Sequence, residues 1–424
     1  MAHTRADVVI VGAGAAGLMT AARLGRALAG ARARVLLLDG ARKVGVKILV
    51  AGGGRCNVTH HAVDERQYAG GSRNTIRKVL RQFDVEHTVA YFAELGVELK
   101  REPTGKLFPV TDRAQTVLDA LLGDVARGGA ELVHPWRVGL IEPEPDGGFT
   151  LHRHNAADSI RASRVVLATG GMALPKSGSD GGGYTLARRL GHTVTDRLFP
   201  ALVPLVTGDR SRWITDLSGI SARTTVEVRS GTGKRLAQFE NDLLCTHFGL
   251  SGPAVMDASR WLTDARHRDP DAALHIGWLL GETFDSVNAS LLALNSTRVL
   301  SWLRDRLPDR LARAICHAHG IDPTLPGAQL GKDARRTLAH ALVAMPVEIT
   351  RDRGFAHAEA TAGGVPLTEV APGTMRSRVH PNLWLVGEIL DVDGRIGGFN
   401  FQWAWSTGAV AGLAIAQDLR AQQL

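Results

Sequence analysis

The first forty residues constrain the fold of this chain more than any other stretch. A short apolar run over 7–11 leads into Gly12-Ala13-Gly14-Ala15-Ala16-Gly17, and an Ala- and Leu-rich segment with helical spacing follows. A second apolar run over 35–38 ends in Asp39, about 20 residues beyond the last glycine. This order of strand, glycine turn, helix, strand and acid predicts a dinucleotide-binding βαβ unit.

Each part of this fingerprint has a physical role. Gly12 allows the tight turn, and Gly14 removes the side chain that would keep a pyrophosphate away from the backbone. Gly17 lets helix and strand pack closely, while the helix N-terminus directs N–H groups at the phosphates. Asp39 can accept hydrogen bonds from both ribose hydroxyls and would repel a 2′-phosphate, which predicts FAD or NAD rather than NADP. The alternative, a glycine-rich turn that binds nothing, does not explain why all these points agree in spacing.

Composition limits the remaining possibilities. At 424 residues the chain is long enough for two or three domains, and its formal charge of +8 comes from scattered arginines without a basic block. Nucleic-acid surfaces usually cluster Lys and Arg with aromatic residues, so this pattern does not by itself predict a nucleic-acid partner. Three cysteines without a CxxC are too few for a disulfide framework or a zinc site. No apolar run reaches the roughly 18 residues of a membrane-spanning helix, and we expect a cytoplasmic protein.

Two further glycine-rich stretches suit a bound ligand. The first, over 45–57, contains three consecutive glycines that let backbone N–H groups approach an anion. Lys47 and Arg55 bring positive charge to this loop, although a mobile surface loop is the alternative. Cys56 could be a redox thiol, but an isolated cysteine beside a cofactor more often packs or contacts through its backbone. The second stretch, Thr169-Gly170-Gly171, ends a buried-strand pattern, where open α/β sheets bind ligands.

A third stretch of this kind lies near the C-terminus. An apolar run over 383–386 ends in Gly387-Glu388, and an acid at this place can bind ribityl hydroxyls. A glycine-rich segment then leads into an Ala-rich helix that begins near Gln402, whose N-terminus can stabilise negative charge on the N1–C2=O edge of a reduced flavin. Glu388, Asp391 and Asp393 could instead bind a divalent metal, but no second ligand cluster accompanies them. We therefore expect no metal.

The order of motifs along the sequence predicts one nucleotide-binding domain, to which the N-terminal and the C-terminal parts of the chain both contribute. Nucleotide-type motifs fill the first part of the chain and return only near its end. Between them, alternating segments such as 224–228 suggest a small β-unit. We therefore expect a nucleotide-binding domain over 1–198 and 351–424, interrupted by an insert over 199–350 that supplies the substrate side.

The chain resembles the bacterial BaiN/YhiN-type FAD-dependent oxidoreductases from end to end. Five segments match the motifs of that family, which are GGGRCN, ATGG, THxGxSGP, TAGGV and a long C-terminal motif, at 52–57, 168–171, 246–253, 361–365 and 387–408. The resemblance implies an α/β fold with a Rossmann-like FAD-binding domain of the two-dinucleotide-binding-domain flavoprotein type. The insert would then be a β-barrel over about 199–275 followed by a small helical unit over about 276–350.

The fingerprint, the glycine-rich segments and the resemblance together assign a set of residues to non-covalent FAD. They are Gly12, Ala13, Gly14, Ala15, Ala16, Gly17, Asp39, Lys47, Gly53, Gly54, Arg55, Cys56, Asn57, Val138, Thr169, Gly170, Gly171, Gly387, Glu388, Asp391, Gly397, Gly398, Asn400, Phe401 and Gln402.

These residues and the resemblance predict a FAD-dependent oxidoreductase that transfers hydride between the flavin and an unidentified small organic substrate. No second GxGxxG follows a strand, so NAD(P)H would dock only transiently as a donor. The first alternative is an oxygen-using oxidase of a small amine that produces hydrogen peroxide. The second is a flavoprotein that binds or modifies nucleic acid, which the positive charge motivates. The sequence leaves the oligomeric state open.

One catalytic candidate lies in the insert. The segment 246–253 places His247 beside hydroxyl residues in a turn that is punctuated by glycines. Histidine side chains titrate near neutral pH, so His247 could exchange a proton with the substrate as hydride moves. The alternative is a histidine that only fixes the insert against the nucleotide-binding domain.

Overall fold

The computed structural model describes residues 4–29 and 33–421, which divide into two compact units. Unit 1 comprises 1–199 and 360–424, and unit 2 comprises 200–359. The second division lies later than the residue 350 expected from the sequence. Backbone hydrogen bonds from Arg353 N–H to the Pro204 carbonyl (3.1 Å) and from Glu359 N–H to the Leu202 carbonyl (3.1 Å) keep this stretch with the insert.

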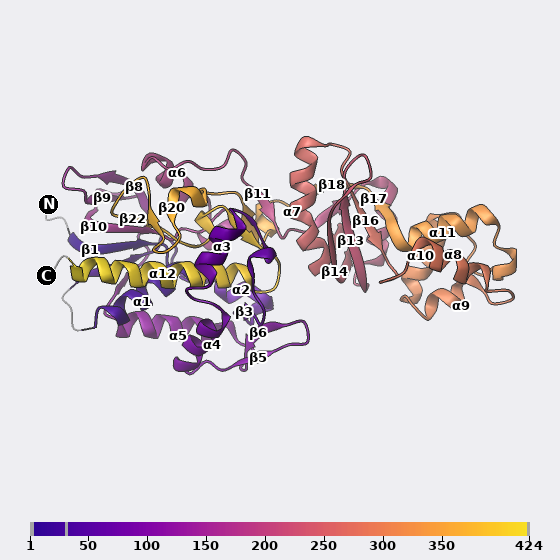
Figure 1. The fold of residues 1–424 in the computed structure, drawn as a ribbon, viewed down its shortest axis with the longest axis horizontal. Helices are drawn as coiled ribbons and strands as arrows, with labels where there is room; N and C mark the ends of the chain where they lie inside the picture. Colours follow the sequence, from indigo (N-terminus) through magenta and orange to yellow (C-terminus); the bar gives the residue numbers. More distant parts are fainter. Residues whose placement is uncertain (1–3, 30–32, 422–424) are drawn as a thin grey trace. The chain divides into compact units, whose positions relative to one another are not determined.

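A nine-stranded sheet forms the centre of unit 1 (Figure 1). Five of its strands are parallel, in the spatial order β7-β2-β1-β10-β22. They are β1 (Thr4–Val11), β2 (Val35–Leu38), β7 (Glu131–Val133), β10 (Ser159–Leu167) and β22 (Leu383–Leu385). The others are β8 (Val138–Pro143), β9 (Phe149–Arg153), β20 (Val370–Ala371) and β21 (Arg376–Ser377). With β1 between β2 and β10, this order is the Rossmann-like arrangement, which confirms the predicted fold class.

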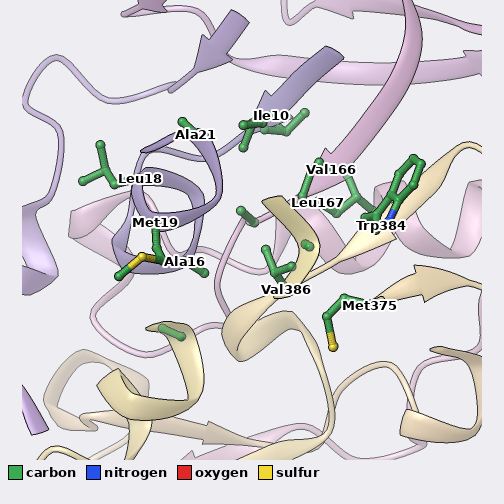
Figure 2. Packing of buried hydrophobic residues seen from close by; sticks show 14 of the residues in the cluster. Ile10, Ala16, Leu18, Met19, Ala21, Val166, Leu167, Met375, Trp384 and Val386 are labelled. Carbon is green, nitrogen blue, oxygen red and sulfur yellow. The ribbon is translucent and has the colours of Figure 1, made fainter. Parts of the chain in front are cut away.

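The parallel strands are apolar along their whole length because both faces of the sheet are covered. Val8, Val9 and Ile10 in β1 have no exposed surface. Figure 2 shows Ile10 of β1 between Ala21 of helix α1 on the left and Val166, Leu167 and Trp384 of the neighbouring strands β10 and β22 on the right.

Helix α1 (Ala15–Ala27) packs along α12 (Phe399–Ala421), the long helix that ends the described chain (Figure 1). A β-carbon on Gly408 would lie 2.6 Å from the Ala16 carbonyl oxygen, and one on Gly412 would lie 2.7 Å from the Thr20 carbonyl oxygen. Glycine at both positions therefore lets the two helix backbones come into direct contact.

Shorter elements complete unit 1. Its remaining helices are α2 (Val46–Gly54), α3 (Arg73–Leu80), α4 (Val85–Glu94), α5 (Ala114–Arg127) and α6 (Gly182–Arg189). Small sheets are formed by β3 (Thr59–His60), β6 (Lys106–Pro109) and β5 (Leu99–Arg101), by β4 (Tyr68–Gly70) with β23 (Val392–Gly394), and by β11 (Phe199–Ala201) with β19 (Ala360–Ala362).

Unit 2 contains a seven-stranded sheet in the order β17-β16-β13-β14-β15-β12-β18, and all its pairs are antiparallel. The strands are β12 (Leu205–Thr207), β13 (Ser221–Arg229), β14 (Arg235–Thr246), β15 (Gly249–Ser251), β16 (Ala273–Gly277), β17 (Met345–Val347) and β18 (Ile349–Asp352). The two edge strands β17 and β18 are separated by Glu348 alone, so the sheet must curl until its edges approach each other. Strands after the helices thus complete the β-unit that the sequence placed wholly before them.

The helices of unit 2 share one apolar core with this sheet. They are α7 (Pro253–Arg268), α8 (Phe284–Leu292), α9 (Val299–Arg304), α10 (Asp309–Ala318) and α11 (Lys332–Ala344). Across both units, no helix of the described residues is long and apolar enough to cross a membrane.

Candidate cofactor site

The ends of the parallel strands bring the predicted motifs of unit 1 together. Val11 lies in register with both Leu38 and Leu167, and Leu167 lies in register with Leu385. Because these strands are parallel, the segments that follow them leave the sheet at the same edge, where open α/β sheets bind ligands. The segments that meet there begin at Gly12, Asp39, Ala168 and Val386.

The glycine turn combines tight packing with room for a ligand. A β-carbon on Gly12 would lie 2.4 Å from the Ala168 carbonyl oxygen, and one on Gly17 would lie 1.8 Å from the Gly12 carbonyl oxygen. These two glycines therefore allow the strands and α1 to pack. A β-carbon on Gly14 would meet no atom of the described chain within 4 Å. Gly14 thus borders open space at the N-terminus of α1, where a pyrophosphate could approach the backbone.

Asp39 is held beside this turn by backbone donors. Its two carboxylate oxygens accept hydrogen bonds from the N–H groups of Ala13 (2.7 Å) and Ala41 (2.7 Å). The Asp39 carbonyl oxygen accepts a further bond from Trp136 N–H at 2.6 Å, so the segment leading to Val138 passes this acid. A carboxylate has about four lone-pair sites, which leaves acceptor capacity for ribose hydroxyls.

Glu388 joins three of the converging segments. One of its oxygens forms an ion pair with Lys47 of α2 (Nζ to Oε2, 2.5 Å), and the other accepts a hydrogen bond from Thr361 N–H at 2.9 Å. A β-carbon on Gly171 would lie 2.5 Å from Thr361 Oγ1 and 3.1 Å from Glu388 Oε1, so only glycine fits there. The structure therefore places Lys47, Gly171 and Glu388 in one cluster.

The glycine-rich bend at the end of α2 is exposed. Gly52 and Gly53 have φ angles of +58° and +69°, and these left-handed conformations interrupt the helix. Gly54 has a φ of +86°. A β-carbon on Gly53 would meet no atom of the described residues within 4 Å. The bend offers open backbone, as a ligand-binding loop requires.

The structure shows Arg55 in an ion pair and Cys56 packed in the core. The Arg55 guanidinium donates to Glu102 Oε1 (2.6 Å) and lies 4.0 Å from the centroid of the Phe108 ring. Its hydrogen bond to Glu102 raises its pKa, and its charge is balanced within the protein. Cys56 is fully buried, and burial raises the pKa of its thiol to about 12. The structure thus favours packing over redox chemistry for Cys56.

Three buried polar atoms around these loops have no hydrogen-bond partner within the part of the chain that the structure describes: Asn57 Oδ1, Thr169 Oγ1 and Ser179 Oγ. Asn57 and Ser179 are only 8% and 5% exposed. Ser179 lies against Gly170, since a β-carbon there would be 2.7 Å from Ser179 Oγ. Buried polar groups are normally hydrogen-bonded, so these atoms fit a site that a polar cofactor completes.

The side chain of Gln402 is bonded within the protein. Its side chain is fully buried, and its amide oxygen accepts hydrogen bonds from the hydroxyls of Thr59 (2.7 Å) and Thr88 (3.0 Å). Its amide nitrogen donates to the Phe83 carbonyl at 3.1 Å. These bonds anchor the first turn of α12, and the predicted cofactor role of Gln402, through the N-terminus of this helix, stays a prediction.

Two neighbouring side chains of the C-terminal motif are also engaged within the protein. The Asn400 side chain forms hydrogen bonds with the backbone N–H (2.8 Å) and carbonyl (3.0 Å) of Gly394, and the Phe401 ring stacks on Trp405 at 5.5 Å. Backbone groups remain for the predicted cofactor role of Asn400. Asp391 donates its N–H to the Val365 carbonyl at 2.9 Å.

Gly397 and Gly398 form the turn before α12, with φ of +127° and +95°. A β-carbon on Gly398 would lie 2.6 Å from the carbonyl carbon of Thr59, so β3 packs directly on the turn. A β-carbon on Gly397 would lie 3.8 Å from Lys106 Cε. The turn thus has a packed side and a side that faces a lysine.

His247 lies in unit 2, at the tip of the β14–β15 hairpin. His247 and Phe248 are the two residues between these strands, and the Thr246 hydroxyl closes the hairpin by donating to the Gly249 carbonyl at 3.0 Å. The His247 side chain is exposed and meets the edge of the Phe248 ring at 5.1 Å. Arg353 lies over the Phe248 ring at 4.2 Å. The proton-transfer role of His247 stays a prediction.

Sequence reasoning missed three residues of the site in unit 1. Thr361 begins the TAGGV segment and holds Glu388, which the motif match could have suggested. Ser179 and Lys106 lie in stretches without a recognisable spacing and reach the site only through tertiary structure. No group of three or more His, Cys, Asp or Glu side chains in the described chain could hold a metal ion, so the metal alternative gains no support.

Comparison with known proteins relates nearly the whole chain to one family. Residues 6–414 match the HI0933-like protein Rossmann domain. The chain is 32% identical over 415 residues to the 3-dehydro-bile acid delta(4,6)-reductase of Clostridium scindens, which spans 96% of this chain and 98% of that protein. It is also 32% identical over 423 residues to the ribosomal RNA dihydrouridine synthase of Escherichia coli, with 98% of each chain covered.

A solved structure of a quinol fumarate reductase variant from E. coli has a related fold. The alignment covers 100% of this chain and 72% of that chain, with a TM-score of 0.53 and 17% identity. At this identity the likeness shows the fold alone.

Proposed function

Because the chain belongs to the HI0933-like family, a family of flavin-dependent oxidoreductases with a Rossmann domain, we propose that it binds FAD non-covalently and reduces a C=C bond conjugated to a carbonyl group. The observation that carries the cofactor part is the convergence of open glycine loops, an acid and unpartnered buried polar atoms at one sheet edge. The substrate part rests on the chemistry that the names of the two relatives share.

Those names describe the same bond change in different molecules. A delta(4,6)-reductase of a 3-oxo steroid and a synthase of dihydrouridine both saturate a C=C bond that is polarised by a carbonyl group. A bond of this kind accepts hydride at the carbon remote from the carbonyl and a proton at the other carbon. The chemistry that these two names share favours reduction of a C=C bond over the oxygen-using oxidation of an amine.

In this proposal the residues of unit 1 bind and orient the cofactor. Gly14 admits the pyrophosphate to the N-terminus of α1, and Asp39 accepts hydrogen bonds from the ribose. Glu388, which is oriented by Lys47 and the Thr361 N–H, accepts hydrogen bonds from the ribityl hydroxyls. The flavin, when bound, supplies the hydride. His247 of unit 2 is the candidate that supplies the proton.

The name of the Escherichia coli relative suggests a uridine in RNA as the substrate, although the scattered arginines do not by themselves predict a nucleic-acid partner. The formal net charge of +8 and the isoelectric point of about 9.8 suit association with a polyanion. A neutral or anionic steroid-like enone would not require this charge. The sequence alone ranked a small organic substrate ahead of nucleic acid, and a relative named for RNA modification is the reason for the revised order.

Anaerobic turnover tests the proposal. The purified protein should be yellow, and NADH or NADPH should bleach it. The reduced protein is then mixed with an unmodified ribosomal RNA transcript, with a 4-ene-3-one steroid and with buffer. Return of the visible flavin absorbance with RNA, together with dihydrouridine in the digested RNA, is expected. Reoxidation by the steroid alone would make the enone the substrate, and a colourless protein that does not bind added FAD would refute the proposal.

A further inference from the structure

The structure brings one lysine to the candidate cofactor site from a part of the chain that the proposed function does not use. Lys106 begins β6, which pairs antiparallel with β3 so that Lys106 lies opposite His60. Strand β3 packs on the turn before α12, where a β-carbon on Gly398 would lie 2.6 Å from the Thr59 carbonyl carbon. The end of the Lys106 side chain reaches Gly397, because its Cε would be 3.8 Å from a β-carbon there.

The charge of Lys106 is not neutralised by the protein. Within the described residues its ammonium group has no ion pair and no hydrogen bond, and the residue is only partly exposed. Two other lysines in this part of unit 1 form ion pairs: Lys47 with Glu388 at 2.5 Å, and Lys100 of the neighbouring strand with Asp112. A partly buried cation without a partner is stabilised by an anionic ligand.

His60, which lies opposite Lys106 on β3, does not supply a positive charge for an anionic ligand. The His60 ring stacks on Phe399 at 5.0 Å, and its nitrogens lie 2.8 Å and 3.1 Å from the carbonyl oxygens of Ala62 and Thr104. Burial lowers the pKa of His60, which favours the neutral form of its ring. Lys106 therefore brings a positive charge from β6 to the turn, in addition to Arg395 of the turn segment itself and to the partial positive charge at the N-terminus of α12.

We propose that the Lys106 ammonium contacts the N1–C2=O edge of the bound flavin and stabilises the negative charge that this edge carries after reduction. The inference rests on the proposed function, since it requires that FAD binds at the sheet edge. A fixed cation near developing charge stabilises the charged state more than the neutral one. Lys106 would thus raise the reduction potential of the flavin and leave the affinity of the protein for oxidised FAD unchanged.

The test measures the two-electron midpoint potential of the bound flavin, which does not depend on knowing the substrate. Wild type is compared with Lys106→Met, with Lys106→Arg, and with Lys100→Met as a matched control that removes a paired lysine from the neighbouring strand. Excess FAD keeps every protein saturated, and the potential is read against a reference dye under anaerobic conditions. The affinity for oxidised FAD and the thermal unfolding temperature are recorded for each variant.

We expect Lys106→Met to lower the preference for reduced over oxidised FAD at least tenfold, which corresponds to about 30 mV for a two-electron couple. Lys106→Arg should keep the wild-type potential, and Lys100→Met should not shift it. An unchanged potential in Lys106→Met, an equal shift in Lys100→Met, or loss of oxidised FAD binding from Lys106→Met in excess FAD would each overturn the role of Lys106. A wild-type protein without bound flavin would instead refute the proposed function itself.

Discussion

The candidate site of unit 1 and the candidate histidine of unit 2 are positioned by different means. At the sheet edge, Glu388 is held by Lys47 and by the Thr361 N–H, so two other segments of the chain orient its carboxylate. His247 lies in a two-residue turn and is exposed, with its ring against Phe248. Sheet topology fixes the first group, whereas a local hairpin fixes the second.

This difference indicates what a substitution can reveal in each unit. In unit 1, a substitution can act through packing, through cofactor binding or through both. Substitutions at neighbouring glycines distinguish these effects, because some glycines are packed and others border open space. In unit 2, the exposed turn has few packing contacts to lose, so a change at His247 reports on chemistry.

Gly14→Val should abolish flavin binding while the protein still folds. The new side chain would enter the space at the N-terminus of α1 where the pyrophosphate approaches, and its β-carbon would meet no atom of the described residues within 4 Å. Gly17→Ala is the matched contrast, because its β-carbon would overlap the Gly12 carbonyl oxygen and should destabilise the fold by about 3 kcal/mol. Flavin absorbance and thermal unfolding distinguish the two, and a fully yellow Gly14→Val protein would contradict the assignment.

His247→Asn should slow the transfer between reduced flavin and substrate by roughly a hundredfold if His247 exchanges a proton. Flavin content and unfolding temperature should stay at wild-type values, since the side chain is exposed. His357→Asn, another exposed histidine of unit 2, serves as the control. An unchanged rate with a true substrate would remove His247 from the mechanism, and a joint loss of flavin and stability would assign it a docking role.

Glu388→Gln should weaken FAD binding by about tenfold. The change removes the charge that pairs with Lys47 and weakens the acceptor for ribityl hydroxyls, and a hydrogen bond to a charged group contributes about 1.5 kcal/mol or more. Titration of the apoprotein with FAD, followed by fluorescence, gives the dissociation constant. Glu142→Gln, at an exposed ion pair with His152, should leave that constant unchanged. Equal affinities in both variants would exclude Glu388 from the cofactor site.

Cys56→Ala should change the turnover rate by less than about twofold, because a buried thiol with a pKa of about 12 is not ionised at neutral pH. For the same reason, iodoacetamide should not label Cys56 in the folded protein, as peptide mass analysis can show. A large loss of turnover with intact flavin content would restore the redox interpretation of this residue.

Motifs that combine a local backbone requirement with a fixed spacing could be predicted from the sequence. Gly12, Gly14 and Gly17 each occupy the place that the fingerprint assigns, because a strand, a turn and a helix leave few alternatives over so short a stretch. The family resemblance extended this to the fold class and to the Glu388 segment. The ion pair of Lys47 with Glu388 joins residues 341 positions apart and could not be predicted from spacing.

The surroundings of the Gln402 and Lys106 side chains could not be predicted from the sequence. The motif placed Gln402 at the start of a helix near the cofactor, but only the packing of α12 against Thr59 and Thr88 turned its amide into the core. Lys106 carries no motif signal, and the β3–β6 pairing carries it to Gly397. The βαβ fingerprint could be predicted from residue order because it depends on local backbone geometry, and the family could be predicted because its motifs are contiguous in the sequence. Tertiary structure decided which side chains face the site, because helix rotation and strand pairing depend on contacts between distant segments.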